Sequence, residues 1–449
     1  MKSKRPTGRT RATTASAPRP RKARTPAATT PTGVSRTRRG GRKAARSSAL
    51  ASAVTIESSV SPARLLARAP SGSPERAHAG RLARLREAAR AKDLTHLLVT
   101  DPRDVGYLTG FLGGDSYLLV PADESVFPIL ISDFRYEEEL AGFKTLARIV
   151  IRKSTMLPCV VETFAAERVE RCGIQGEHMT VAERDTLADR MDKAIGDPGR
   201  PGHGVLVPTR GILTAMRSVK DDHEVALIRH AVRIQQDALL ALRPTISPGQ
   251  TELEIAARLE SEMKSRGSVE PAFTSIVAAR ANGSLPHHRP GATRAAFRQP
   301  LLIDWGAKWL GYCSDMTRTF HLGPWSATMR DVYRIVLDAH ILAADSLRAG
   351  VTTAEIDRIA REHISRHGHG ERFGHGLGHG IGINVHEEPR LTQQVDPVAL
   401  AAGNVLTIEP GIYLPGVGGV RIENDYLVTP TGAECLCTLP MDLEWSVLG

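Results

Sequence analysis

The chain has 449 residues, which is long enough for two or three domains with a full hydrophobic core. Its formal net charge of +10 is unevenly distributed: residues 1–50 hold 15 of the 59 Lys and Arg and no acid, which leaves 44 basic against 49 acidic residues in the remainder. No apolar run approaches the ~20 residues of a membrane span, so the sequence argues against an integral membrane protein.

Residues 1–77 are predicted to form a disordered basic extension. A segment so rich in Pro, Thr, Ala, Ser and Arg has too little apolar surface to offset the entropy that ordering costs. The Arg- and Ser-rich, acid-poor composition is typical of an organelle transit peptide, and it also suits a tail that contacts nucleic acid without sequence preference. A solvated extension with no role of its own is the third interpretation.

The cysteines indicate that the protein is found in a reducing compartment. They make no spaced metal motif, and their number is odd in a long chain, which favours a reducing environment. They are Cys159, Cys172, Cys313, Cys435 and Cys437. We therefore expect a cytoplasmic protein, while targeting to an organelle by the basic extension stays open.

Ordered structure is expected to begin near residue 78. RLARLREAARAKDL predicts a helix and THLLVT, directly after it, a short strand, and further strand-like runs begin at Tyr117 and Pro128. Helices that alternate with strands are typical of a small α/β domain. The sequence therefore predicts such a domain over residues 78–210, ending near a Pro- and Gly-rich stretch that begins at Gly196.

Beyond that domain the chain is internally repeated. PGQTELEI at 248–255 and AGVTTAEI at 349–356 align at an offset of 101 residues, and longer amphipathic helical patterns precede them over 220–243 and 326–348. Because a solenoid needs three or more units, we predict one α+β domain with internal pseudo-symmetry over residues 211–449. Each half has the spacing of a capping box, at Thr251 and Glu254 and at Thr352 and Glu355.

Residues 375–388 read HGLGHGIGINVHEE and combine three histidines, two acids and four glycines. His375 and His379 have the spacing found in zinc-protease helices, but glycines that cost roughly 1 kcal/mol each would destabilise a helix interior. The period of two favours an extended strand, in which both histidines share a face and another backbone or a ligand can come close. A glycine-rich loop with solvent histidines is the alternative.

Two predicted hairpins carry carboxylates. In QPLLIDWGAKWLGYCSDMTRTFHLG, a fold at Trp309 and Leu310 would place Asp304 opposite Asp315. In VLTIEPGIYLPGVGGVRIENDYLV, the second pair, Glu409 and Glu423, has its midpoint at Gly416, inside a turn-like sequence, and should also face across the hairpin.

Four carboxylates in one cleft repel one another unless protons or cations intervene. Two divalent cations would remove the repulsion, and carboxylates that bridge could hold them ~3.5 to 4 Å apart. With His379 as the nitrogen ligand, the set suits Mn²⁺, Fe²⁺, Co²⁺ or Zn²⁺, and its many oxygens favour Mn²⁺. A solvated hairpin face is the alternative for any single acid.

These motifs, with ANGSLPHHRPG and GHGLGHGIGINVHEEP, resemble the pita-bread metallopeptidases, the superfamily of methionine aminopeptidase, aminopeptidase P, prolidase and creatinase. The similarity is greatest to the Xaa-Pro branch and covers essentially the whole chain from about residue 78. It implies a pita-bread catalytic domain with an internal pseudo-two-fold repeat, preceded by a smaller α/β creatinase/prolidase-type domain.

The resemblance also implies roles for individual residues. Asp315 and Glu423 would bridge two metal ions, and Arg421 and Tyr413 would lie beside the ligands. Where the family usually has Glu-Asp, this chain has Glu423-Asn424. The full ligand set would be Asp304, Asp315, His379, Glu409 and Glu423, and the active-site histidines would be His287, His375 and His386.

The implied reaction is hydrolysis of the bond before proline by a metal-bridging hydroxide, with Glu409 as the base and His386 beside the oxyanion. For His386 to do so, the chain must turn after Ile383, and Asn384 suits such a turn. His288, His367 and His369 are expected at the surface.

We expect an Xaa-Pro aminopeptidase that acts on peptides with proline in the second position and forms a homodimer or a higher homo-oligomer. The nearest alternative is an Xaa-Pro dipeptidase. A non-catalytic protein on the same fold that binds peptide or nucleic acid, and creatinase-type chemistry, are the more distant ones.

Overall fold

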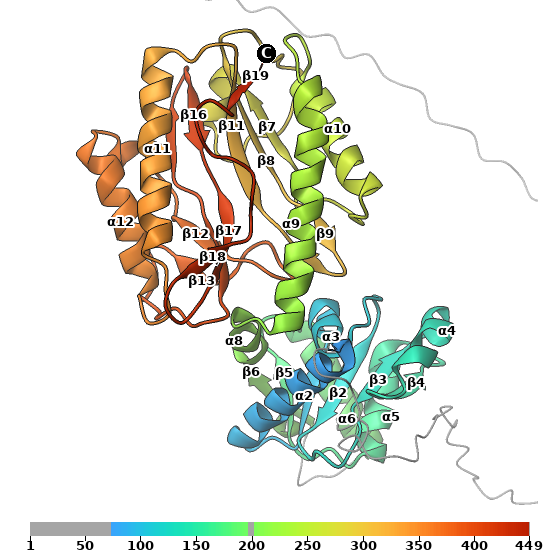
Figure 1. Cartoon of the computed structure of the whole chain (residues 1–449). Coiled ribbons are helices and arrows are strands. Elements are labelled where there is room, and N and C mark those ends of the chain that lie inside the picture. Colours follow the sequence, from blue (N-terminus) through green and yellow to red (C-terminus); the bar gives the residue numbers. More distant parts are fainter. Residues whose placement is uncertain (1–72, 196–201, 449) are drawn as a thin grey trace, which may run out of the picture. The chain divides into compact units, whose positions relative to one another are not determined.

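The computed structural model describes residues 73–195 and 202–448 (Figure 1). The predicted basic extension lies outside the described residues as far as residue 72. Helix α2 (Pro74–Ala91) begins earlier than the predicted position of residue 78. The cause is local, because the Ser73 hydroxyl accepts a hydrogen bond from the Arg76 N–H and Pro74 occupies the first turn, where no N–H is needed.

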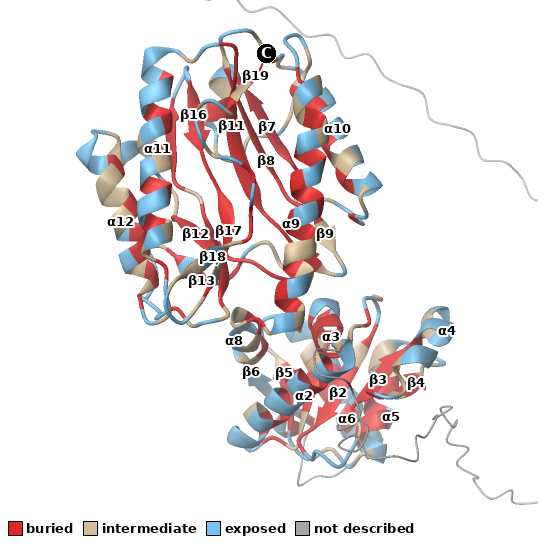
Figure 2. Ribbon diagram, viewed as in Figure 1, coloured by how far each residue is buried: buried red, intermediate tan, exposed pale blue. Residues whose placement is uncertain are grey.

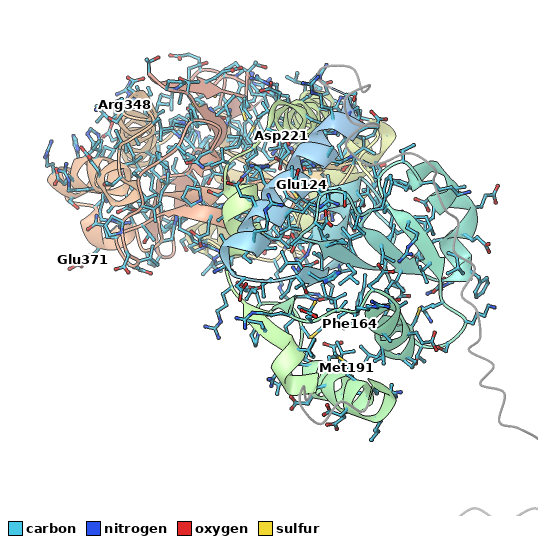
Figure 3. The ribbon with its side chains drawn as sticks, turned by 90° about the horizontal axis from the view of Figure 1, so that it is seen from below. Glu124, Phe164, Met191, Asp221, Arg348 and Glu371 are labelled. Atoms are coloured by element: carbon cyan, nitrogen blue, oxygen red, sulfur yellow. The ribbon has the colours of Figure 1, made fainter. Side chains whose placement is uncertain are left out.

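The N-terminal part forms one mixed sheet in the strand order β4-β3-β2-β1-β5-β6. The three strand-like runs and the helix seen in the sequence are therefore confirmed as elements. Phe164 and Met191, which Figure 3 labels, belong to a core cluster on this sheet. The strands are β1 (His96–Val99), β2 (Tyr117–Pro121), β3 (Ile129–Ser132), β4 (Arg148–Ile151), β5 (Cys172–Gln175) and β6 (Leu206–Thr209). The helices after α2 are α3 (Pro102–Thr109), α4 (Glu137–Leu140), α5 (Met156–Ala166), α6 (Val181–Ile195), α7 (Gly202–Val205) and α8 (Ile212–Ser218).

The C-terminal part contains the two repeated helix pairs predicted from the sequence. They are α9 (Asp222–Leu242) with α10 (Glu252–Ser265), and α11 (Ala327–Asp345) with α12 (Thr353–Arg366). The capping box of α10 has both of its hydrogen bonds, whereas at α12 the Thr352 side chain accepts the Glu355 N–H as a simple N-cap. The two pairs lie on either side of the strands in Figure 1.

Two main sheets carry the site. The first has the order β19-β11-β8-β7 and the second β13-β12-β14-β17-β18. Figure 2 shows the central strands β8, β11, β12 and β14 buried and the outer faces of the helices exposed. The strands of the first are β7 (Ile276–Ala279), β8 (Pro300–Trp305), β11 (Met316–Leu322) and β19 (Val447–Leu448). Those of the second are β12 (Gly378–Gly380), β13 (Glu387–Leu391), β14 (Val405–Ile408), β17 (Asn424–Val428) and β18 (Ala433–Cys435). The small hairpins are β9 (Lys308–Trp309) with β10 (Tyr312–Cys313), and β15 (Gly411–Leu414) with β16 (Gly418–Arg421).

The register of the first hairpin differs from the prediction. Asp304 lies opposite Thr317, and not opposite Asp315. The chain folds at Leu310 and Gly311, both of which have positive φ, one residue later than expected. Leu is rarely found in that conformation, so composition could not place the turn. Asp315, directly before β11, nevertheless lines the same cleft as Asp304.

The register of the second hairpin agrees with the prediction. The pairs of β14 with β17 and of β15 with β16 all share a midpoint at Gly416. Glu409 and Glu423 lie at the breaks between these strands, opposite each other in register. Gly416 has a φ of 77°, a conformation that favours glycine, which explains why LPGVGG was a reliable turn signal.

Candidate metal centre

Three buried side chains from different elements meet in the C-terminal part. One potential ligand atom from each of Asp315, His379 and Glu423 lies within 4.8 Å of the others. Asp315 precedes β11, His379 is the middle residue of β12, and Glu423 precedes β17. Within residues 73–195 and 202–448, no other group of three His, Cys, Asp or Glu side chains has this geometry.

The other two predicted ligands adjoin this group. Nε2 of His379 lies 3.3 Å from Oε1 of Glu409. The Glu409 N–H donates to the Leu377 carbonyl at 2.8 Å, so the glutamate is hydrogen-bonded to the segment that carries His379. Asp304, at the end of β8, accepts a hydrogen bond from Arg421. The five side chains predicted as ligands therefore line one cleft.

Steric contacts explain why glycines flank His379 in β12. A Cβ at Gly378 would lie 2.0 Å from the carbonyl oxygen of Thr407, and one at Gly380 would lie 2.2 Å from that of Glu388. Neighbouring backbones therefore approach on both sides of His379, as the extended-strand interpretation predicted. The strand is shorter than the glycine pattern suggested, because only three residues form the ladder.

A buried hydrogen-bond network surrounds the acids. Arg421 donates from Nε to the Thr317 hydroxyl at 2.9 Å and from Nη1 to the Tyr413 hydroxyl at 3.0 Å. The Tyr413 oxygen lies 2.8 Å from Nε2 of His375. The Thr317 hydroxyl donates to Oε2 of Glu423 at 2.6 Å. Arg421, Tyr413 and His375 are thus connected to the acids without joining the group itself.

The acids cannot all be ionised without a counter-charge. Burial, and then the charge of Glu423, hold the pKa of Asp315 well above its usual range, and burial with Glu409 does the same for the pKa of Glu423. Burial also raises the pKa of Asp304. At Glu409, burial acts to raise the pKa, but the hydrogen bond and charge of His379 outweigh it, so the pKa is lowered.

The donor set fits divalent cations. Oδ1 of Asp304 and Oδ1 of Asp315 are buried and have no hydrogen-bond partner among the described residues. Buried carboxylate oxygens are normally satisfied, so two such oxygens on residues that line one cleft indicate a place where a cation can bind. Four carboxylates with one imidazole are the ligands that Mn²⁺ and related ions accept.

The cleft has a volume of about 530 Å³ and also contains the three predicted active-site histidines. His375 is half-buried, and burial lowers its pKa. His287 and His386 are exposed at the cleft. Although the residue is exposed overall, loss of hydration of its ring in the cleft and the charge of His379 lower the pKa of His386 to about 4, which keeps its imidazole neutral at pH 7.

The predicted turn before His386 is confirmed. Strand β13 runs antiparallel to β12, and the Gly382 N–H donates to the Asn384 carbonyl at 3.1 Å within the connection. As a result, the rings of His386 and His379 lie edge to face with centroids 4.2 Å apart. Alternation along a straight strand would have separated them.

Some residues at or near the site were not predicted. Asp425 accepts the Asp315 N–H at 3.1 Å, and Arg289 and Arg390 line the cleft. The acid could have been suspected from its place two residues after Glu423. Arg289 lies within the motif ANGSLPHHRPG, but neither its spacing nor that of Arg390 indicates a role.

The three histidines expected at the surface differ in burial. His367 is exposed, and His369 is half-buried. His288 is also half-buried, and its Nε2 lies 2.9 Å from Oε2 of buried Glu252. The partner of His288 lies 36 residues earlier in the chain, in α10, so no local sequence pattern indicated this contact.

The fold and the acids define a two-domain metallopeptidase, and the comparisons with known proteins agree. Residues 226–430 match the model of metallopeptidase family M24, and residues 81–219 match the creatinase/prolidase N-terminal domain. The chain belongs to metallopeptidase family M24, and it has the pita-bread fold that its motifs predicted.

The relatives come from the Xaa-Pro branch. The chain is 32% identical to an Xaa-Pro dipeptidase of Pyrococcus furiosus over 365 residues, which is 81% of this chain and 99% of that one. A solved Xaa-Pro dipeptidase from Bacillus anthracis has a TM-score of 0.76 and 30% identity, covering 83% of this chain and 100% of its own. An X-Pro aminopeptidase from Thermotoga maritima has a TM-score of 0.71 and 31% identity, covering 81% and 99%.

The protein is therefore a metal-dependent hydrolase of the Xaa-Pro peptidase group. None of the helices in the described part of the chain combines the length and the apolar character that crossing a bilayer requires. The aminopeptidase activity expected from the sequence is not specifically supported, because several of the relatives and solved structures whose names give an activity are Xaa-Pro dipeptidases or prolidases.

Proposed function

We propose that this protein is an Xaa-Pro dipeptidase, which hydrolyses the bond between an N-terminal residue and a C-terminal proline. The observation that carries the proposal is the presence of two arginines, Arg289 and Arg390, that line the same cleft as the acids and are exposed. A dipeptide has its free carboxylate one residue beyond the scissile bond, and arginine suits carboxylate recognition. Relatives named as Xaa-Pro dipeptidases support the same conclusion.

Two divalent cations, with Mn²⁺ favoured, are proposed at Asp304, Asp315, His379, Glu409 and Glu423. When bound, such ions make a water molecule acidic enough to attack at neutral pH and polarise the substrate carbonyl. Because the cations neutralise the acids, all four carboxylates can then be ionised together.

The protein's own groups supply the remaining chemistry. Glu409 is proposed to take the proton of the attacking water and to pass it to the leaving proline nitrogen. The Glu409 N–H, which donates to the Leu377 carbonyl at 2.8 Å, fixes the backbone of this residue beside the segment that carries His379. His386 donates a hydrogen bond to the developing oxyanion, and its neutral ring has one N–H for this.

Substrate length tests the proposal. Metal-reconstituted protein is assayed on Xaa-Pro dipeptides, the same dipeptides with a C-terminal amide, and Xaa-Pro tripeptides. We expect the free dipeptide to have the highest kcat/KM and the amide to lose about tenfold or more, since a charged hydrogen bond of roughly 1.5–3 kcal/mol is removed. Arg390→Ala and Arg289→Ala then show which arginine recognises the carboxylate, because only that variant should stop discriminating dipeptide from amide.

An Xaa-Pro aminopeptidase is the second candidate, and the likeness to the Thermotoga maritima enzyme favours it. It predicts that tripeptides and longer peptides are cleaved at least as well as dipeptides. Equal rates on the dipeptide and its amide would favour this activity over the dipeptidase.

A further inference from the structure

The connection between β12 and β13, residues 381–386, carries His386 and is bonded to several parts of the protein. Cys313 belongs to the hairpin that leads to Asp315, and its N–H donates to the Gly382 carbonyl at 2.7 Å. The Asn384 N–H donates to Oε1 of Glu387 at 2.9 Å. The carboxylate of Glu387 therefore closes the turn that places His386 beside His379.

The same carboxylate is part of a buried ion cluster. Arg217 donates from Nη2 to Oε1 of Glu387, and Nζ of Lys220 lies 3.4 Å from Oε2. Nη1 of Arg217 donates to Asp104 in α3 at 2.8 Å. The side chain of Lys220 is 0% exposed and that of Glu387 is 6% exposed. Two cations and two anions thus neutralise one another in a dry environment, where position is tightly determined.

The cluster packs directly against the turn. A Cβ at Gly382 would lie 2.7 Å from Oε2 of Glu387 and 3.1 Å from Cε of Lys220, so the backbone rests on the ion pair. Arg103, also in α3, donates from Nη1 to Oδ1 of Asn384 at 3.0 Å. The turn is therefore bonded to the N-terminal domain twice, once through Arg103 and once through the Arg217 cluster.

We propose that Glu387, held by Arg217 and Lys220, is a positioning residue that sets where His386 lies over the metal centre, and that the N-terminal domain controls catalysis through this cluster. The inference rests on the proposed role of His386 and extends it to residues that do not line the cleft next to the acids. It assigns the N-terminal domain a role in catalysis although none of the described residues that line the cleft comes from that domain.

The physical consequence concerns the transition state. A hydrogen-bond donor must lie within a few tenths of an ångström of the oxyanion, and a displacement of ~1 Å can cost about 10²-fold in rate. Glu387 does not touch substrate under this proposal, so its loss should lower kcat with little change in KM.

The first test combines Glu387→Asp with His386→Ala in a double-mutant cycle on metal-loaded, full-length protein with an Xaa-Pro dipeptide. The shorter carboxylate keeps the charge of the cluster but cannot reach Asn384 and Arg217 together. We expect Glu387→Asp alone to lower kcat about tenfold or more, and to lower it less than about twofold when His386 is already alanine. Equal factors in both backgrounds would overturn the proposal, since the glutamate would then act independently of His386.

Glu224→Asp is the matched control. Glu224 is also a buried glutamate that accepts a backbone N–H, that of Asp221 at 3.0 Å, and lies 3.9 Å from an N-terminal arginine, Arg81. A third partner is the Tyr312 hydroxyl, which donates to Oε1 of Glu224 at 3.2 Å, and none of the three partners lies in the turn of residues 381–386. Aspartate also keeps the negative charge that acts on Lys220. Glu224→Asp should change kcat by the same factor whether His386 is present or replaced by alanine. This comparison separates an effect of general destabilisation from an effect on the position of His386.

Hydrogen exchange provides a measurement that needs no activity. The Asn384 amide should exchange faster in Glu387→Asp than in the unmodified protein, and Glu224→Asp should leave it unchanged. Unchanged exchange at residues 382–386 would overturn the inference even if the protein is an Xaa-Pro dipeptidase. Altered exchange together with normal kcat in His386→Ala would instead refute the role proposed for His386, and the positioning role with it.

If Glu387→Asp does not fold, the pair Glu387→Met with Lys220→Met, which removes the acceptor for the Asn384 N–H, replaces it in the same cycle. That pair removes one charge of each sign, so the remaining Arg217 and Asp104 still balance each other. The same non-additivity with His386→Ala is expected, and additivity would again contradict the proposal.

Discussion

Arg421 donates from Nη2 to Oδ2 of Asp304 at 2.5 Å, and both side chains are buried in the cleft, at 4% and 11% exposure. This ion pair shows that Arg421 binds only one of the acids of the site. Its other nitrogens are occupied by Thr317 and Tyr413, so the guanidinium cannot move towards the other acids. It therefore orients Asp304 while leaving Oδ1 of that carboxylate for a cation.

We expect Arg421→Lys to weaken metal binding or activity by about 10–100-fold, because a single ammonium nitrogen cannot occupy the three positions from which Nε, Nη1 and Nη2 donate to different partners. Metal content by elemental analysis and kcat at saturating Mn²⁺ check this. Tyr413→Phe is the companion variant, which removes only one of the three contacts and should have the smaller effect. Full metal affinity and turnover in Arg421→Lys would contradict the orienting role.

His386→Ala should retain its metal and lose about 10²-fold in kcat, because a donor used mainly in the transition state is removed. Its ring lies beside that of His379 but outside the group of mutually close ligand atoms. Steady-state kinetics and metal analysis of the same preparation of His386→Ala test both expectations. Loss of metal would make His386 a ligand, and near-normal kcat would remove it from the mechanism.

We expect Asp425 to make the unfolding free energy of the metal-free protein depend on pH. Burial raises its pKa from 3.8 to about 7, so the folded state holds the proton more tightly than the unfolded state does. Its contribution to stability is therefore present at low pH and is lost as the pH rises from about 4 through about 7. Asp425→Asn should flatten the decline in unfolding free energy over this range, which for one titrating group is at most roughly 1.4 kcal/mol for each step of one in pH.

Denaturant titrations of the chelated protein at several pH values provide this measurement. Asn keeps an oxygen to accept the Asp315 N–H, so the comparison isolates the charge. Parallel stability curves for the two proteins would show that Asp425 does not titrate in this range.

Asn424→Asp should stabilise the protein. The guanidinium of Arg318 is buried, and it donates to four backbone carbonyls and to Oδ1 of Asn424 at 2.8 Å, all neutral acceptors. A carboxylate would place an opposite charge at the same distance. A charged hydrogen bond contributes about 1 kcal/mol more than a neutral one, which corresponds to roughly 2–4 °C in Tm for a domain of this size.

Thermal unfolding of Asn424→Asp beside Asn424→Ala checks this expectation. The alanine variant leaves Nη2 of Arg318 with one acceptor fewer and should be destabilised. A lower Tm for the aspartate than for asparagine would mean that the new charge repels Glu423 more than it attracts Arg318.

Much of the architecture could be predicted from local sequence. The capping residues at Thr251 and Thr352 and the repeat around them specify equivalent helices, because caps act within one turn. The turn at Gly416 set the register of Glu409 with Glu423, since glycine marks a positive φ that other residues avoid. The similarity of the motifs to a known family supplied the remaining expectation, and the match to family M24 confirms it.

The sequence by itself therefore determined the elements, the repeat and the set of acids, because these depend on spacing and on turn residues close along the chain. Only the tertiary structure decided the pairing of Asp304 with Thr317, which depends on a positive φ at Leu310. It alone brought together Asp104, Arg217, Lys220 and Glu387, whose partners lie up to 170 residues apart. Residues so far apart along the chain leave no local sequence pattern that would reveal their pairing. The fold brings them together and removes the water that would screen their charges, so the pairing depends on the tertiary structure.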